Sequence, residues 1–254
     1  MALFSNTKIL YHQGKQFIPD VTTAKVPGIF RGRPVITTQK IDEANLETLC
    51  PVKAISINPV AIDLGKCTLC GECAKQYPEK ISFTTDYKIS TNERDRLIVK
   101  EGDDHPIEVN PLTVRQVIHK TFGRSLKLRQ ISAGGDGSCE CELNSANNVQ
   151  FDMCRFGIDF VASPRHADGI VITGPITENM AQAVQMCYDA VPEPKIVVLV
   201  GTDAISGGIM QENEAVNRSF LNNIPVDLYI PGNPAHPLTI INGLLDLTRK
   251  KARK

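Results

Sequence analysis

Hydrophobic and polar residues follow different patterns in the two halves of this chain. From residue 124 onward, short apolar runs alternate with amphipathic stretches of helical spacing. Short apolar runs are typical of strands buried on both faces, and strands that alternate with helices form a parallel sheet. The pattern therefore predicts an α/β fold with a doubly wound parallel sheet. The expected strands are 126–131, 158–162, 169–173, 195–200 and 226–230, and the expected helices are 140–153, 178–190, 214–221 and 238–251.

The N-terminal half shows no such alternation. Residues 1–35 contain Pro19, Pro27 and Pro34, and we expect an extended segment without a long helix there. A cysteine-rich stretch and a polar stretch follow, and residues 113–122 have the spacing of a short helix that Thr113 could cap. We therefore expect a first domain over 1–95, a linker with a short helix over 96–124, and an α/β domain over 125–254.

Composition and charge narrow the class of protein. The 254 residues are 42% hydrophobic and 22% charged, which is ordinary for a globular chain. Lys and Arg number 28, as do Asp and Glu, so we expect no nucleic-acid partner. No apolar run approaches the ~18 residues of a membrane span. Residues 1–16 lack the apolar core of a signal peptide, so we expect a cytoplasmic protein.

Eight cysteines provide the most specific signal. Three of them follow the spacing Cys67-x2-Cys70-x2-Cys73, which can place three thiolates on one cubane iron–sulfur cluster. The fourth ligand of such a cluster is usually a distant Cys followed by Pro, and Cys50 precedes Pro51. A zinc site or free buried cysteines are the alternatives, although zinc sites favour two separated pairs of ligands. The other cysteines are at 139, 141, 154 and 187.

The first half resembles a known family at these residues. The stretches 30–34 (FRGRP), 50–55 (CPVKAI) and 67–73 (CTLCGEC) are similar to the ferredoxin-like subunit of formate hydrogenlyase and of complex I. That resemblance implies a ferredoxin-like α+β domain with two cubane sites whose ligands cross between the two half-motifs. The ligands of one site are all kept, and those of the other site are all replaced, by Lys40, Glu43, Leu46 and Tyr77. It thus implies one 4Fe–4S cluster on Cys50, Cys67, Cys70 and Cys73.

The second half resembles the small subunit of energy-converting NiFe hydrogenases and the 20 kDa subunit of complex I. The similar stretches are 155–159, 163–168, 172–175, 206–209 and 226–232. In that family four cysteines hold a cluster next to the catalytic subunit. The corresponding positions here are Asp136, Cys139, Asp203 and Asn233, so one thiol remains and no standard cluster is expected. We expect the polar replacements to accept hydrogen bonds from backbone N–H groups or ordered water.

The remaining cysteines have plainer interpretations. Cys141 would point roughly 200° away from Cys139 on a helix, so the two would not share a ligand easily. We interpret Cys154 and Cys187 as small buried hydrophobic side chains. The basic C-terminal residues 249–254 fit a solvated tail, with anionic lipid or an acidic partner as alternatives.

The two resemblances together imply an electron-transfer or scaffold subunit of a membrane-associated oxidoreductase complex. The implied partners are a hydrogenase large subunit, similar to the 49 kDa subunit of complex I, and membrane-arm subunits reached indirectly. The chain would lie on the inner face of the cell membrane and would not be catalytic alone. Two alternatives stay open: an assembly module with a structural cluster, and a small-molecule pocket lined by Asp136, Asp203 and Asn233.

Overall fold

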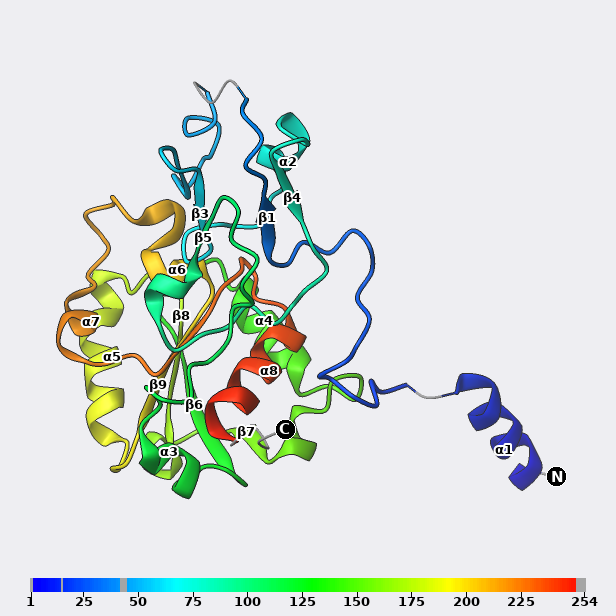
Figure 1. Ribbon diagram of the computed structural model, residues 1–254. Helices are drawn as coiled ribbons and strands as arrows, with labels where there is room; N and C mark the ends of the chain where they lie inside the picture. Colours follow the sequence, from blue (N-terminus) through cyan, green and yellow to red (C-terminus); the bar gives the residue numbers. More distant parts are fainter. Residues whose placement is uncertain (1, 15, 42–44, 250–254) are drawn as a thin grey trace.

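A five-stranded parallel sheet forms the centre of the C-terminal half (Figure 1). The computed structural model describes residues 2–14, 16–41 and 45–249. The strands follow the order β10-β9-β8-β6-β7, and every neighbouring pair is parallel. Their bounds are β6 (Leu126–Ser132), β7 (Ile158–Phe160), β8 (Gly169–Thr173), β9 (Ile196–Val200) and β10 (Leu228–Ile230). All residues of β8 and β9 are buried, as expected for central strands covered on both faces.

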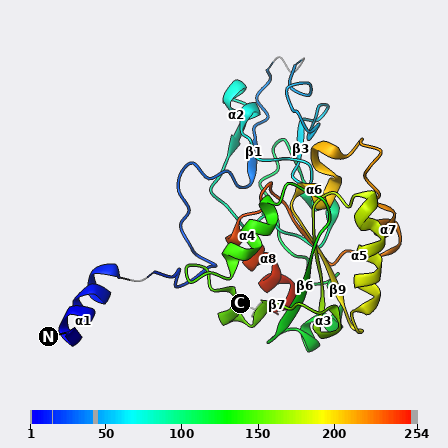
Figure 2. The same ribbon diagram turned by 180° about the vertical axis from the view of Figure 1, so that it is seen from behind.

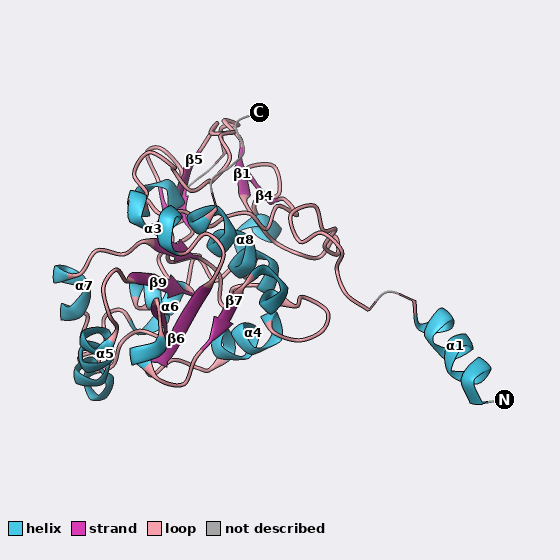
Figure 3. Cartoon of the chain, turned by 90° about the horizontal axis from the view of Figure 1, so that it is seen from below, coloured by secondary structure: helices cyan, strands magenta, loops and turns pink. Residues whose placement is uncertain are grey.

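Helices cover both faces of this sheet, which confirms the predicted doubly wound α/β class (Figures 1 and 3). One face carries α5 (Glu178–Ala190) and α7 (Ser219–Asn223). The other face carries α3 (Gln116–Thr121), α4 (Ser138–Ala146) and α8 (Pro237–Thr248). Eleven of the residues of α8 are buried, so this helix is a central part of the core rather than a surface helix.

The N-terminal half contains two small antiparallel sheets, with the short helix α2 (Glu72–Gln76) beside them. In the first sheet, β1 (Pro34–Ile36) pairs with β4 (Ile81–Phe83). In the second, β3 (Ala61–Asp63) lies between β2 (Ile55–Ser56) and β5 (Ile98–Lys100). The helix α2 precedes β4. This arrangement is compatible with the expected α+β domain, whose boundaries stay a prediction.

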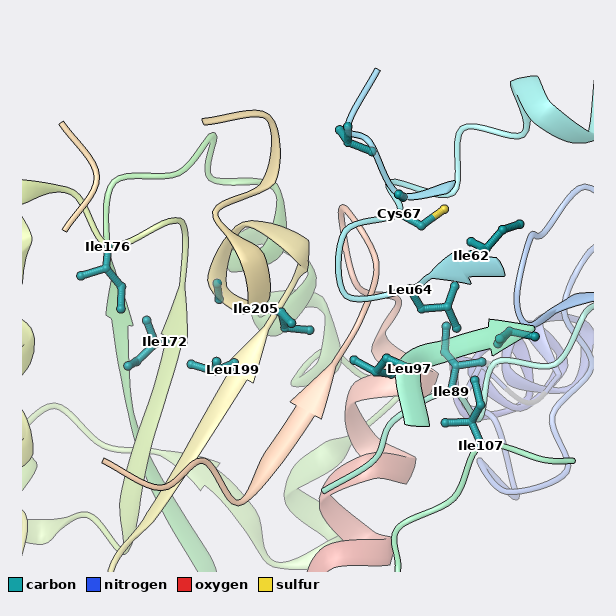
Figure 4. Packing of buried hydrophobic residues seen from close by; sticks show 14 of the residues in the cluster. Ile62, Leu64, Cys67, Ile89, Leu97, Ile107, Ile172, Ile176, Leu199 and Ile205 are labelled. Atoms are coloured by element: carbon teal, nitrogen blue, oxygen red, sulfur yellow. The ribbon is translucent and has the colours of Figure 1, made fainter. Parts of the chain in front are cut away.

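The two halves share one hydrophobic core (Figure 4). Leu64 and Leu97 of the N-terminal half belong to the same buried cluster as Leu199 and Ile205 of the C-terminal half. An isolated antiparallel bridge joins Thr91 to Tyr229 of β10, with N–H···O distances of 3.1 and 2.8 Å. The N-terminal half therefore packs directly onto the edge of the parallel sheet.

Several expected elements differ from the structure. The segment expected to be extended at the N-terminus contains α1 (Ala2–Gln13), where no Pro or Gly interrupts the chain before Gly14. The helix expected over 140–153 begins earlier and ends at Ala146, because residues 147–152 form turns.

The prediction of a helix over 214–221 is mostly wrong. Val216 forms an antiparallel bridge with Thr177, so the chain is extended there. The helix α7 begins only at Ser219, whose N–H and hydroxyl groups donate to the Asn217 side chain. A further short helix, α6 (Thr202–Ser206), lies in a segment expected to be a loop.

Two other expectations concern helix ends. Thr113 does not cap α3, because its hydroxyl group instead contacts Asn92 and Glu93. The last helix ends at Thr248, and residues 250–251 of the expected helix lie outside the described residues. Among the described helices, none has the length and apolar character needed to cross a bilayer.

Candidate metal centre and the neighbouring polar loops

Cys50, Cys67, Cys70 and Cys73 line one pocket, which we call the cysteine pocket. Cys50 follows a turn, Cys67 and Cys70 lie in the loop after β3, and Cys73 lies in α2. The other lining side chains include the apolar residues Val52, Ile55 and Ile62. The structure thus brings together the four cysteines that the sequence spacing singled out, although Cys50 is far from the others in the chain.

Backbone N–H groups point at two of these sulfur atoms. The N–H group of Ala54 donates to Cys50 Sγ at 3.3 Å, and that of Leu69 donates to Cys67 Sγ at 3.4 Å. Leu69 has a φ of 56° and Gly71 a φ of 81°, so the loop turns around the pocket in a left-handed conformation. A Cβ atom at Gly71 would lie 2.9 Å from Cδ of Arg31, so this position requires glycine. The loop backbone is therefore shaped to donate hydrogen bonds to sulfur.

Burial determines the protonation of the inner two thiols. Cys67 and Cys73 are buried, Cys50 is half-buried and Cys70 is exposed. Burial, with a smaller contribution from the neighbouring cysteines, raises the pKa of Cys67 to about 12 and that of Cys73 to about 11. Without a positive centre among them these thiols stay protonated, so binding of iron would release protons.

The donor set of the cysteine pocket is that of a cubane cluster, which is held by four cysteine thiolates. The apolar lining, and the N–H groups that donate to Cys50 and Cys67, suit sulfur ligands. Among the described residues, no three His, Cys, Asp or Glu side chains are grouped so that they could hold one metal ion.

Three of the four residues that replace the other set of ligands belong to the described part of the chain. Leu46 is 0% exposed and belongs to the core, and Tyr77 packs against the same core. Lys40 is exposed, and Glu43 lies outside the described residues. Apolar packing therefore occupies at least one of these positions.

Asp136, Cys139, Asp203 and Asn233 lie beyond the carboxyl ends of three parallel strands, and we call them the polar loop site. Asp136 and Asn233 are in loops, whereas Cys139 and Asp203 are in the first turns of α4 and α6. Cys139 is 5% exposed. A Cβ atom at Gly201 would overlap Cys139 Sγ, so this sulfur packs directly against the next loop. Burial raises the pKa of Cys139 to about 12, with a smaller opposing effect from a hydrogen bond to the Ala235 backbone. The structure thus gathers these loops as the parallel topology predicts.

Ser138 joins two of the polar residues. Its N–H group donates to Asp136 Oδ1 at 2.9 Å. Its hydroxyl group donates to the same oxygen at 2.6 Å and to Asn233 Oδ1 at 3.2 Å. The hydrogen bonds from the Ser138 side chain and backbone lower the pKa of Asp136. The expected backbone hydrogen bond is therefore confirmed for Asp136, whereas Asn233 lies near a hydroxyl group.

Asp203 has a different environment from Asp136, and its expected hydrogen bond to a backbone N–H group is not seen at Oδ1. Its Oδ1 atom is buried without a hydrogen-bond partner among the described residues. A Cβ atom at Gly208 would overlap this oxygen, so the loop after α6 closes tightly over the carboxyl group. Burial raises the pKa of Asp203, and the nearby Asp136 and Glu140 carboxylates raise it further. Burial and the neighbouring carboxylates thus both disfavour the ionised form of Asp203.

Two residues that the sequence did not single out hold these loops. The guanidinium group of Arg218 donates to the carbonyl groups of Pro175, Asp203, Ala204 and Ile205 at 2.7–3.2 Å. Glu140 accepts hydrogen bonds from Ser132 Oγ at 2.5 Å and Thr173 Oγ1 at 2.8 Å. The sequence carried no signal for either, because their partners are distant in the chain.

The remaining cysteines have diverse environments. Cys141 is exposed while Cys139 is buried, which confirms that the two point apart on α4. Cys187 is half-buried on α5. Cys154 is exposed, so its interpretation as a buried hydrophobic side chain is wrong; it lies in the short 3-10 turn Met153–Phe156 before β7.

His236 has a structural role. Its Nδ1 accepts a hydrogen bond from the Leu238 N–H group at 3.2 Å and so caps α8. Its ring makes edge contacts with Phe30 and Phe151, and burial lowers its pKa.

Comparison with known proteins places the C-terminal half. Residues 137–247 match the family described as NADH ubiquinone oxidoreductase, 20 Kd subunit. An NADH-quinone oxidoreductase subunit of Clostridium beijerinckii is 43% identical over 172 residues, which are 67% of this chain and 93% of the relative. The "Probable membrane-bound hydrogenase subunit mbhJ" of Pyrococcus furiosus is 34% identical over 134 residues, 53% of this chain and 80% of the relative.

A chain from the structure of the membrane-bound sulfane sulfur reductase, an archaeal respiratory membrane complex, shares 29% identity. It superposes with a TM-score of 0.44 and covers 50% of this chain and 71% of its own length. The near-complete coverage of the Clostridium beijerinckii relative decides the assignment. The chain belongs to the family of the 20 kDa subunit of NADH–ubiquinone oxidoreductase, which includes this bacterial relative.

Proposed function

We propose that this chain is an electron-transfer subunit of a membrane-bound oxidoreductase complex and holds one 4Fe–4S cluster on Cys50, Cys67, Cys70 and Cys73. The observation that carries the proposal is that these four cysteines line a single pocket. When bound, a cluster of this kind supplies reversible one-electron transfer. The matching relatives are named as subunits of an NADH-quinone oxidoreductase and of a membrane-bound hydrogenase, which supports this setting.

The residues of the chain shape the pocket for that role. The N–H groups of Ala54 and Leu69 stabilise negative charge on the sulfur atoms of Cys50 and Cys67. The apolar side chains of Val52 and Ile62 exclude water from the inner side. Cys70 is exposed, so one corner of the pocket reaches the surface. This exposed corner favours electron exchange over a purely structural cluster.

We propose further that the polar loop site holds no standard cluster. Cys139 is its single thiol, and the other three positions offer two carboxyl groups and an amide. Low-charge iron–sulfur clusters require thiolate donation, and an amide is a poor iron ligand. The tight contacts of Cys139 with Gly201, and of Asp203 with Gly208, also leave little space for a small molecule.

A large-subunit homologue, similar to the 49 kDa subunit of complex I, is the proposed direct partner. Ile209 is 70% exposed and Met210 43% exposed, and both follow the Asp203 loop directly. Exposed apolar side chains beside the functional loops suit a protein partner. Membrane-arm subunits would contact the chain through this partner, and the proposed location of the chain is the cytoplasmic face of the membrane.

Metal analysis of the anaerobically prepared full chain tests the proposal. We expect about four irons and about four acid-labile sulfides per chain, because one cubane contains four of each. Cys70→Ser should remove most of the iron, whereas Cys141→Ser, which changes another exposed thiol, should leave it unchanged. An iron content near eight would show that the polar loop site is occupied, and one bound zinc would refute the cubane.

A redox titration followed by electron paramagnetic resonance separates electron transfer from a structural role. Reversible reduction of the protein at physiological potentials supports electron transfer. A full iron content with no reducible signal would instead support an assembly module with a structural cluster.

A further inference from the structure

The helix α1 stands away from the rest of the molecule (Figures 1 and 2). Three of its large apolar side chains, Phe4, Leu10 and Tyr11, are 76%, 68% and 85% exposed. Residues seven apart lie nearly in line on a helix, so Phe4 and Tyr11 share one face, with Leu10 on its flank. Ile9, 52% exposed, points to the opposite side. The helix therefore carries an apolar face that no part of the described fold covers.

A helix of this length needs a surface to pack against. Isolated helices shorter than ~12–15 residues are marginal in water, and most helical stability comes from packing an amphipathic face. α1 has 12 residues and no acidic residue in its first turn. An additional surface that covers Phe4 and Tyr11 would supply the missing packing.

The charge around α1 indicates which surface this is. Residues 1–19 contain no Asp or Glu, whereas Lys8, His12 and Lys15 are basic. An apolar helix face flanked by basic residues is the pattern of helices that lie in the interface of anionic membranes. A second copy of the same basic helix would instead be repelled by like charge.

The chain is fixed to the body just after α1. The N–H group of Ile18 donates to the Gln150 carbonyl at 2.8 Å, and the Arg155 guanidinium donates to the Ile18 carbonyl at 2.5 Å. Arg155 also lies 5.5 Å from the ring centroid of Phe17. A surface that binds α1 must therefore lie within a few residues' reach of the 3-10 turn Met153–Phe156.

The C-terminal end of the described chain meets the same turn. The guanidinium group of Arg249 donates to the Phe156 carbonyl at 2.7 Å and lies 5.6 Å from the Phe156 ring centroid. The sequence continues from there with Lys250, Lys251, Arg253 and Lys254. Ile18 and Arg249, near the two ends of the described chain, thus both contact this turn.

We propose that α1 binds the surface of an anionic membrane, with Phe4, Leu10 and Tyr11 inserted among the lipid headgroups and the basic residues of the chain adding electrostatic attraction. This gives the chain a direct contact with lipid, in addition to any contact through partner subunits. The cysteine pocket plays no part in it.

Vesicle cosedimentation of the purified full chain tests this proposal. We expect binding to vesicles of phosphatidylethanolamine and phosphatidylglycerol, and at least tenfold weaker binding to phosphatidylcholine alone. Phe4→Gln should weaken binding about tenfold, because a buried aromatic side chain contributes on that scale. Ile9→Gln changes a neighbouring apolar residue on the opposite side and should leave binding within about twofold. Removal of residues 250–254 should weaken binding and flatten its salt dependence.

The outcomes distinguish an anionic membrane from a second copy of the chain as the binding partner of the apolar face. Equal binding of Phe4→Gln and Ile9→Gln, equal binding to the two kinds of vesicle, or no binding at all would overturn the proposal. A dimer in light scattering that Phe4→Gln dissociates would assign the face to a second copy. Unchanged iron content and circular dichroism of the variants serve as the folding control.

Discussion

The cysteine pocket and the polar loop site each contain a deeply buried thiol, yet the side chains around the two thiols differ. Cys67 and Cys139 are 8% and 5% exposed, and burial raises the pKa of each to about 12. Cys67 has three further cysteines around its pocket, whereas Cys139 has two carboxyl groups and an amide near it. The burial of a cysteine therefore says little about metal binding, because the number of thiols around the same space decides it.

The strongest test of this contrast replaces each of the two buried cysteines separately. Cys67→Ala should remove most of the iron from the protein, because three thiols cannot complete the four corners of a cubane. Cys139→Ala should keep about four irons and cost about 1–2 kcal/mol of unfolding free energy. Iron and labile-sulfide assays on anaerobic protein measure both effects. Loss of iron in Cys139→Ala would show that the two sites are more alike than we propose.

A second test concerns the replaced ligand position in the N-terminal half. Leu46 is 0% exposed, so Leu46→Ala should lower the unfolding free energy by about 2–5 kcal/mol through the cavity it leaves. Leu112→Ala, at a residue 92% exposed, should change it by less than about 0.5 kcal/mol. Urea denaturation compares the two. Equal midpoints would mean that apolar packing does not stabilise the Leu46 position.

Arg218 provides a third test, on the polar loops themselves. Burial lowers the pKa of its guanidinium group to about 10, which still leaves it charged at neutral pH. Arg218→Lys cannot reach all four carbonyl groups and should cost about 2 kcal/mol through unpaired acceptors. Arg165→Lys, at an exposed arginine of a short surface turn, should have almost no effect on the thermal midpoint. A small change in Arg218→Lys would show that the loops hold their shape without it.

The smallest expected effect separates the two carboxyl groups of the polar loop site. The raised pKa of Asp203 means that its ionised form destabilises the fold, so stability falls as pH rises from 3.8 through the raised value. Asp203→Asn should therefore add about 1 kcal/mol to the unfolding free energy at pH 7, and this gain should vanish below pH 3.8.

Asp136 should show the opposite sign. Its pKa is lowered, so its ionised form contributes stability above pH 3.8 that is lost as pH falls through the lowered value. Asp136→Asn should thus destabilise the protein at pH 7. Denaturation curves at pH 4, 5.5 and 7 measure both variants, and a shared sign would contradict the different environments of the two groups.

The sequence predicted the parallel sheet well for a physical reason. β8 was predicted from end to end, because strands buried on both faces are short, continuous apolar runs. The bounds of α5 were also predicted, since it is an amphipathic helix with clear ends. By contrast, the start of α7 depends on hydrogen bonds to the Asn217 side chain, and the spacing of apolar residues does not record such bonds.

The two sites were predictable to different extents. The spacing of the cysteines predicted the cysteine pocket, because cysteines at these intervals are typical ligands of an iron–sulfur cluster. The resemblance to a known family located Asp136 and Asp203, but not Arg218 or Glu140. Their hydrogen bonds join residues far apart in the chain, and such contacts depend on the tertiary fold rather than on local sequence.

The bridge between Thr91 and Tyr229 has a consequence for how a larger assembly would be built. Its two backbone hydrogen bonds, with the shared core around them, hold both halves of one polypeptide in a fixed orientation. Separate subunits dissociate on dilution, whereas parts of one chain keep a high effective concentration of each other. A complex that recruits this protein therefore receives both halves in a one-to-one ratio and in a single docking event.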